Sequence, residues 1–283
     1  MRKKGKILQY KRVLTIQDIS CVGQCSMTVA LPIISACGLE TAVLPSAVLS
    51  THTGGFNGFT CHDLTEDFPA IGAHWEKEKI KFDAVYTGYL GSVKQVEYVL
   101  QIMQSAAKSS CKKIVDPAMG DNGKLYPAFN DDYVAAMRNL CAKADIVIPN
   151  ITEASFLTGV AYKTDYDEKY VKELCDKLQV MGAKTVVLTG VSYKKGRTGV
   201  VVADVAGLQY YEHEQLPQSY HGTGDVFASA FTGALLQGKT TMAAAQIAAN
   251  YTVQCIRNTV EDKEHWYGVK FETCLRTLQK ELE

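Results

Sequence analysis

The chain has 283 residues, of which 47% are hydrophobic, and it carries 30 basic and 30 acidic side chains. This length and apolar content suffice for a full hydrophobic core, and the balanced charge excludes the basic surface typical of proteins that bind nucleic acid or membrane surfaces. We therefore expect a single domain, residues 1–283, whose partners are small molecules or a second copy of the chain.

The first 12 residues are rich in Lys and Arg but lack the apolar stretch and cleavage site of a signal peptide. No window approaches the roughly 18 apolar residues that a membrane span needs. The nine cysteines are odd in number and show no paired CxxC spacing, which is typical of free thiols in a reducing compartment. We expect a basic tail, residues 1–12, on a soluble cytoplasmic protein that binds no membrane.

Short runs rich in Val, Ile and Leu, each bounded by turn residues, predict strands at 13–18, 40–50, 83–89, 112–118, 145–150 and 185–190. Helical spacing between these runs predicts helices at 92–109, 129–142 and 167–181. Near the end of the sheet, 197–204 and 208–214 are expected to form a hairpin. Buried strands that alternate with helices are typical of a mainly parallel sheet covered on both faces. The predicted fold is an α/β protein with three α/β/α layers.

Polar residues follow almost every predicted strand. In a parallel sheet, ligands bind beyond the carboxyl ends of the strands, where loops carry the groups that the core excludes. The residues found at these ends include Asp18, His52, Thr53, Tyr89, Asp116, Asn150 and Thr189. We therefore expect the functional site at this edge of the sheet.

Asp116 ends one strand, and Asn150 and Glu153 form an N-x-x-E pattern at the turn after the next. Magnesium takes a few protein oxygens and keeps several waters, so these residues suit a metal ion carried by a nucleotide. Alternatively, Asn150 or Thr152 caps a helix and Glu153 is its first-turn carboxylate, a role compatible with metal binding. The intervening loop, 120–130, is either a solvated loop or a lid in which Lys124 supplies charge to bound phosphates.

Residues 221–240, HGTGDVFASAFTGALLQGKT, contain two patterns for phosphate binding. The second, Gly233 to Thr240, matches the P-loop GxxxxGK[ST], but a P-loop follows a strand and Gly233 lies within helical apolar spacing. Gly238 and Thr240 instead predict a helix end and the N-cap of a helix at 241–257. We therefore reject a nucleotide-binding P-loop here.

The first pattern, Gly222-Thr223-Gly224-Asp225, opens a predicted helix. The glycines permit a tight turn close to a ligand, and the helix start presents unpaired N–H groups, so these residues predict an anion hole. Asp225 either stabilises the helix dipole or accepts a proton beside the bound anion. A carboxylate next to a phosphate repels it, so its presence here is better explained if Asp225 accepts a proton.

Together, Asp116-Pro-x-x-Gly120-Asp121, Asn150-x-x-Glu153 and Gly222-Thr223-Gly224-Asp225 resemble the ribokinase superfamily. Within it, the segments VLSTHTGGFNGFT, FDAVYTGYLGS, VDPAMGDNGKLY and ADIVIPNITEA are similar to the vitamin B6 kinases, which are pyridoxal and pyridoxamine kinases. The resemblance extends from about residue 13 to residue 257.

The resemblance implies a ribokinase-like fold and ATP- and magnesium-dependent phosphorylation of the 5′-hydroxymethyl group of a B6 vitamer. Asp225 would accept the hydroxyl proton, and the N–H groups of Gly222, Thr223 and Gly224 would stabilise the γ-phosphate. Magnesium on ATP would be held by Glu153, Asn150 and Asp116, and Thr189 would contact the ATP phosphates. The pyridine ring would be lined by His52, Thr53 and Tyr89. Homodimers are frequent in the family, so we expect one here.

Asp18 departs from the pattern, because many pyridoxal kinases have serine at this position. An acidic residue there, together with His221 before the glycines, resembles hydroxymethylpyrimidine kinases of thiamine synthesis, whereas Asp225 favours the B6 kinases. An aspartate at the ring would accept a hydrogen bond from an amino group or a protonated ring nitrogen, so the preferred vitamer stays open. Two alternatives stay open as well: a hydroxymethylpyrimidine kinase, and a non-catalytic protein that binds a vitamer or nucleotide.

Overall fold

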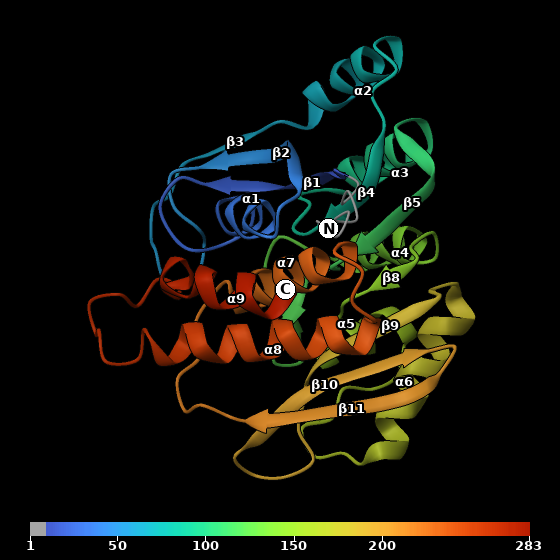
Figure 1. Cartoon of the computed structure of the whole chain (residues 1–283). Coiled ribbons are helices and arrows are strands. Elements are labelled where there is room, and N and C mark those ends of the chain that lie inside the picture. Colours follow the sequence, from blue (N-terminus) through green and yellow to red (C-terminus); the bar gives the residue numbers. More distant parts are fainter. Residues whose placement is uncertain (1–9) are drawn as a thin grey trace, which may run out of the picture.

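The structure is a computed structural model that describes residues 10–283 (Figure 1). Its main sheet contains β1 (Arg12–Ser20), β2 (Glu40–Leu49), β3 (Cys61–Asp63), β4 (Phe82–Thr87), β5 (Ala107–Val115), β8 (Ile146–Val147), β9 (Thr185–Val191), β10 (Arg197–Asp204) and β11 (Gly207–Glu214). A separate small hairpin consists of β6 (Gly120–Asp121) and β7 (Lys124–Leu125). Most of the predicted basic tail, residues 1–12, lies outside the described residues, and β1 already begins at Arg12.

The α-helices are α1 (Met27–Ala36), α2 (Phe68–Lys77), α3 (Val93–Ser105), α4 (Asp131–Cys141), α5 (Ile151–Thr158), α6 (Glu168–Met181), α7 (Thr223–Leu236), α8 (Thr241–Arg257) and α9 (Leu275–Leu282). Short 3-10 helices lie at Thr65–Asp67 and Phe271–Cys274. No helix among residues 10–283 is long and apolar enough to cross a bilayer.

The strand order in the main sheet is β11-β10-β9-β8-β5-β4-β1-β2-β3. Neighbouring strands from β9 to β2 run parallel, and antiparallel pairs occur only at the two edges of the described sheet. Helices α1, α7, α8 and α9 cover one face, and α3 to α6 cover the other (Figure 1). The predicted three-layer sandwich with a mainly parallel sheet is confirmed.

Two hydrophobic cores flank the sheet because successive strand residues point to opposite faces. In β1, Leu14 and Ile16 belong to the core beneath α3 to α6, whereas Val13 belongs to the core beneath α1, α7 and α8. The central strands are therefore buried on both faces, which explains their continuous apolar sequence.

One predicted boundary was wrong. The helix expected at 92–109 ends at Ser105, and β5 begins at Ala107 instead of residue 112. Ala107 pairs with Phe82, and the register then shifts before the pairing continues further along β5. Residues 108–110 are exposed, so they carry no apolar pattern that would indicate a strand.

The second phosphate pattern forms a helix end, as predicted. Gly233 lies inside α7, Gly238 has a left-handed φ of 95°, and the Thr240 hydroxyl accepts a hydrogen bond from the Ala243 N–H at 3.2 Å. The rejection of a P-loop at this position is therefore confirmed. Gly233 serves packing instead, because a Cβ there would lie 2.3 Å from the Sγ of Cys37 at the end of α1.

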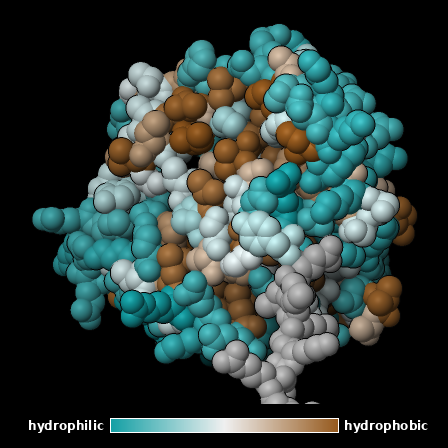
Figure 2. Space-filling view, turned by 45° about the horizontal axis from the view of Figure 1, so that its top comes forward, coloured by the Kyte–Doolittle hydropathy of each residue, from teal (hydrophilic) through white to brown (hydrophobic). Residues whose placement is uncertain are grey.

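The surface carries large apolar side chains on several separate elements. They include Leu31 in α1, Val43 in β2 and Phe59 in the loop after β2. Figure 2 shows one face as mostly hydrophilic, with hydrophobic side chains gathered around hollows in its upper and central parts. Single exposed apolar residues are normal on protein surfaces, so these identify no binding site by themselves.

Replacing glycine by alanine should have opposite effects at two helical positions. Gly72→Ala in α2 should raise the free energy of unfolding by about 0.5–1 kcal/mol, because alanine favours the helix and its Cβ has room, with the nearest atom 3.4 Å away. Gly233→Ala should lower it by about 1–3 kcal/mol because of the contact with Cys37. Urea unfolding of both variants measures the difference, and equal stabilisation would contradict the packing of α7 on α1.

Candidate active site

The turn before α7 is shaped by Gly222, which is the N-cap of the helix. Its φ of 79° lies in the left-handed region, and a Cβ there would lie 1.8 Å from the carbonyl oxygen of Gln24. Glycine is therefore required both by the backbone conformation and by the neighbouring chain. The first N–H groups of α7 have no acceptor within the helix, and Gly224 is exposed. This turn can thus bind an anion from solvent.

Asp225 lies in the first turn of the same helix. The residue is half-buried, and desolvation of its carboxylate raises the pKa of Asp225 to about 7, with the charge of Asp18 acting in the same direction. The Ser26 N–H donates a hydrogen bond to Asp225 Oδ2 at 2.9 Å, which opposes this shift. A carboxylate with a pKa near neutrality is suited to accept a proton.

Ser26 is a site residue that the sequence did not reveal. It precedes α1 with a φ of 53° and a ψ of −126°, an unusual conformation for a residue other than glycine, and its side chain makes no cap hydrogen bond. Such a conformation costs on the order of 1–3 kcal/mol and persists where its surroundings enforce it. Here it directs the Ser26 N–H at Asp225.

Asp18 is a second buried carboxylate close to Asp225. It lies in β1 where the pairing with β2 shifts register, and the Ser20 hydroxyl donates to its Oδ2 at 3.0 Å. Burial raises the pKa of Asp18, whereas hydrogen bonds from the Ser26 and Ser20 side chains lower it. Ser26 thus affects both acids, since its N–H donates to Asp225 and its side chain lowers the pKa of Asp18.

His52 connects two loops near these acids. Its Nε2 lies 2.7 Å from the Tyr267 carbonyl oxygen, and its Nδ1 accepts the Gly54 N–H at 3.1 Å. The Tyr267 carbonyl can only accept a hydrogen bond, so Nε2 must carry the hydrogen, and the ring is the neutral Nε2–H form. Burial lowers the pKa of His52. Both nitrogens are used within the protein, and the side chain is buried, so His52 fixes the two loops to each other.

The other predicted ring-binding residues differ in exposure. Thr53 is exposed, whereas Tyr89 is half-buried beside Phe129, with 5.4 Å between the ring centroids. On the opposite side, Phe56 packs on His52 and Trp266, with centroids 5.0 Å and 4.6 Å away. Aromatic side chains therefore flank the region of Asp18 and Asp225 and are suited to a flat, partly apolar ligand.

Asn150 and Glu153 form a reciprocal capping box at the start of α5. The Asn150 side chain accepts the Glu153 N–H at 2.9 Å, and Glu153 accepts the N–H groups of Asn150 and Met119 at 2.8 Å and 3.2 Å. Burial nevertheless raises the pKa of Glu153 to about 7. The predicted helix cap is confirmed, and it holds a carboxylate at the edge of the sheet.

Asp116 follows β5 as another buried carboxylate. Burial raises the pKa of Asp116, and the charges of Glu153 and Asp225 raise it further. Among the described residues, neither Asp116 nor Glu153 forms an ion pair with Lys, Arg or His. Two buried, mutually repelling oxygen donors of this kind fit a divalent cation that keeps several waters.

The loop at 120–130 contains the β6–β7 hairpin, which is fastened to the start of α5. The Asn150 side chain donates to the Gly120 carbonyl, and the Gly123 N–H donates to the Thr152 hydroxyl, each at 2.9 Å. Lys124 is exposed in β7, and Thr189 forms a β-bridge with Asn150. The residues predicted for ATP and metal are thus brought together around α5.

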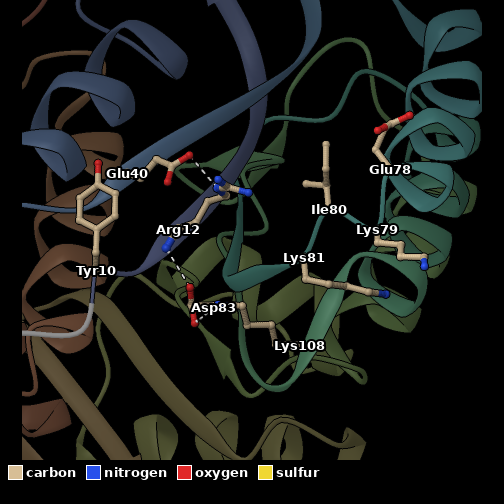
Figure 3. Close-up of a pocket in the computed structure, with 9 residues that line it drawn as sticks. All are labelled: Tyr10, Arg12, Glu40, Glu78, Lys79, Ile80, Lys81, Asp83 and Lys108. Carbon is tan, nitrogen blue, oxygen red and sulfur yellow. Dashed lines mark hydrogen bonds and ion pairs between the residues drawn. The ribbon is translucent and has the colours of Figure 1, made fainter.

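A pocket of about 470 Å³ lies elsewhere, at the amino ends of the strands (Figure 3). Its charged residues largely neutralise one another, since Arg12 pairs with Glu40 at 2.6 Å and Lys108 pairs with Asp83 at 2.8 Å. The candidate active site is therefore the acidic cluster at the carboxyl ends of the strands.

A family profile described as phosphomethylpyrimidine kinase matches residues 32–269. The chain belongs to the phosphomethylpyrimidine kinase family. The matched residues include Asp116, Glu153 and Asp225 of the acidic cluster, whereas Asp18 in β1 lies before them.

Solved structures of relatives agree with this family assignment. A candidate phosphomethylpyrimidine kinase from Bacteroides thetaiotaomicron, solved in a form with pyridoxal, is 36% identical, with 95% of this chain and 96% of that chain covered and a TM-score of 0.91. A pyridoxal kinase from Lactobacillus plantarum is 32% identical, with 95% of this chain and 97% of that chain covered and a TM-score of 0.89. The predicted membership of the vitamin B6 kinases within the ribokinase superfamily is confirmed.

A curated relative carries the other activity considered for this chain. The hydroxymethylpyrimidine/phosphomethylpyrimidine kinase of Bacillus subtilis is 28% identical over 223 residues, which are 78% of each chain. The chain is thus similar both to pyridoxal kinases and to a hydroxymethylpyrimidine/phosphomethylpyrimidine kinase.

Asp116→Asn should make the metal-free protein more stable. The folded-state pKa of Asp116 lies above its unfolded value of 3.8, so its ionisation costs folding free energy as the pH rises through and above that value. In EDTA at pH 8 the variant should gain on the order of 1 kcal/mol in the free energy of unfolding, and the gain should shrink towards pH 4. A variant less stable than the parent at pH 8 would contradict the lack of a cationic partner.

Proposed function

We propose that the protein transfers the γ-phosphate of ATP to the 5′-hydroxymethyl group of pyridoxal, pyridoxamine or pyridoxine. The observation that carries this proposal is Asp225, a carboxylate with a pKa of about 7 beside the open N–H groups at the start of α7. Two relatives that are at least 32% identical support the substrate class, one named a pyridoxal kinase and one solved with pyridoxal.

In the proposed reaction, Asp225 accepts the proton of the 5′-hydroxyl as its oxygen attacks the γ-phosphorus. The new O–P bond forms as the bond to ADP breaks, and negative charge develops on the transferred phosphoryl oxygens. The N–H groups of Gly222, Thr223 and Gly224 stabilise this charge without having to reorganise. The helix start and the base thus act on the same phosphoryl group from neighbouring positions in the chain.

Magnesium on the nucleotide would be held by Asp116 and Glu153, with the Asn150 side chain beside them. These residues suit a cation because both carboxylates are buried and neither has a basic partner among the described residues. When bound, the ion neutralises charge on the phosphates. Thr189 and Lys124 would contact the phosphates, and the β6–β7 hairpin would act as a lid that excludes water.

The pyridine ring would lie between the aromatic groups that flank Asp18. Tyr89 and the ring of His52 would contact its faces and edge, Thr53 would lie at the entrance, and the Asp18 carboxylate would bind a ring nitrogen or amino group. A homodimer and a cytoplasmic location stay predictions for this chain. Sedimentation of the purified protein tests the first of these.

Hydroxymethylpyrimidine is the second candidate substrate, because Asp18 and the Bacillus subtilis relative favour it. ADP release should be measured with ATP and magnesium on pyridoxal, pyridoxamine, pyridoxine and hydroxymethylpyrimidine, against a blank without substrate. Fastest turnover on a B6 vitamer is the expected result, and fastest turnover on the pyrimidine would assign the protein to thiamine synthesis. Nucleotide binding without ADP release on any substrate would indicate a non-catalytic protein.

Asp225→Asn should lower kcat by roughly 10²–10⁴-fold with little change in ATP affinity, because the amide cannot accept the hydroxyl proton. Lys239→Ala is the matched control for the rejected P-loop. Its amine donates to the Glu281 carbonyl at the surface, so turnover should not change. Full activity of folded Asp225→Asn, or a large loss in Lys239→Ala, would contradict the assigned site.

The pH dependence of kcat/KM should show an acidic limb near pH 7. Asp225 has a pKa raised to about 7, and only its ionised form accepts a proton, so activity should fall as the pH decreases through this value. Initial rates at subsaturating vitamer between pH 5 and 9 test this. A constant kcat/KM down to pH 5 would show that a group with an ordinary carboxyl pKa, or no base, controls the reaction.

A further inference from the structure

Three polar side chains are buried between the sheet and α7 without a place in the proposed reaction. Gln17 in β1, Tyr86 in β4 and Ser229 in α7 are each 0% exposed. Gln17 Oε1, the Tyr86 hydroxyl and Ser229 Oγ are buried and have no hydrogen-bond partner within residues 10–283. We call these three residues the polar seam.

The polar seam lies directly behind Asp225. Ser229 is one helical turn after Asp225 and therefore on the same face of α7. Across from the helix, Tyr86 pairs with Thr15 in the sheet, and Gln17 follows two residues later on the same face of β1. All three seam residues thus point into the layer between the sheet and α7.

Neighbouring groups fix the orientation of the Gln17 side-chain amide. Its Nε2 donates to the Thr15 hydroxyl at 2.7 Å, which fixes the amide and leaves Oε1 as an acceptor. Oε1 lies close to Gly88, where a Cβ would be only 2.4 Å away. Glycine at this position gives the amide its room.

Tyr86 connects the polar seam to the acids. Burial raises the pKa of Tyr86, and the next contributions come from the charges of Asp116 and Asp225. The side chains of Ser229 and Gln17 lower the pKa of Tyr86. Because Tyr86 pairs with Thr15 and the Gln17 amide donates to the Thr15 hydroxyl, the phenol and the amide lie on neighbouring strands at the same face of the sheet.

Leaving such groups unsatisfied is costly. A buried donor or acceptor without a partner costs about 1–3 kcal/mol, and folded proteins usually satisfy such groups with ordered water. A buried water needs two to four polar partners, and the polar seam offers donors and acceptors from three different elements. A hydrophobic replacement at all three positions would avoid this cost, so their grouping beside Asp225 requires a reason.

We propose that Gln17, Tyr86 and Ser229 hold ordered water behind Asp225, and that Tyr86 acts through this water to position the carboxylate that accepts the substrate proton. The inference rests on the proposed function, since it concerns the same base. Tyr86 is a positioning residue in this account, because it contacts neither the substrate nor the phosphates.

Tyr86→Phe tests the inference, with Thr232→Val as the matched control. Thr232 lies in α7, three residues beyond Ser229, and its buried hydroxyl also has no hydrogen-bond partner in the described part of the chain. Tyr86→Phe should lower kcat on the order of 10-fold, the size of one lost hydrogen bond, with the KM values for vitamer and ATP unchanged. Ser229→Ala, a smaller change, should act in the same direction, and Thr232→Val should leave kcat unchanged.

The same substitution in an Asp225→Asn background separates positioning from a purely structural role. If Tyr86 acts through Asp225, its replacement should have no further effect on kcat once the base is absent. An equal loss in both backgrounds, a change in KM alone, or full activity of both Tyr86→Phe and Ser229→Ala would overturn the inference.

Failure of the inference and failure of the proposed function give different results. Full turnover by Asp225→Asn would show that Asp225 is not the base, and the proposed mechanism would then be wrong. Inactive Asp225→Asn together with fully active Tyr86→Phe would leave the proposed function intact and remove only the role of the polar seam. A high-resolution crystal structure that shows these three side chains packed together without water would also contradict it.

Discussion

Desolvation of one carboxylate at the start of α7 is the constraint on which the rest of the site depends. Burial brings the pKa of Asp225 to about 7, and the same turn presents open N–H groups to an anion. A base and an anion site are thus held at fixed positions by one helix. Gly222 makes the turn possible, and the unusual conformation of Ser26 supplies a hydrogen bond that keeps the carboxylate in place.

The acidic character of the site follows from the same arrangement. Asp18, Asp116 and Glu153 also have raised pKa values, and these three carboxyl groups are buried, whereas Asp225 is half-buried. Such a cluster opposes folding when it is ionised, and natural proteins tolerate this cost at functional sites. A magnesium ion on a nucleotide and a ring that offers hydrogen-bond donors would each relieve part of the repulsion. The proposed ligands therefore complement the charge of these carboxyl groups.

Much of this could be predicted from the sequence, because strand ends and helix starts have local signals. The apolar runs predicted the central strands, and the glycines around Thr223 predicted the turn before α7. Helix α1 was missed, since its apolar residues carry no clear one-sided pattern and Pro32 lies inside it. Contacts between distant segments were also beyond local patterns: Ser26 reaches Asp225, and His52 bonds the Tyr267 carbonyl. The polar seam combines residues from β1, β4 and α7, and no local sequence pattern in any of the three indicates that these residues come together.

Phosphoryl transfer at the start of α7, with Asp225 as the base, can be tested by a crystal structure with ADP, magnesium, aluminium fluoride and pyridoxine. Aluminium fluoride mimics the phosphoryl group during transfer, so its position identifies the reacting centre. We expect it to bind at the N–H groups of Gly222, Thr223 and Gly224, in line with the 5′-hydroxyl and with Asp225 at hydrogen-bond distance from that hydroxyl. Aluminium fluoride bound away from the start of α7, or a 5′-hydroxyl remote from Asp225, would contradict it.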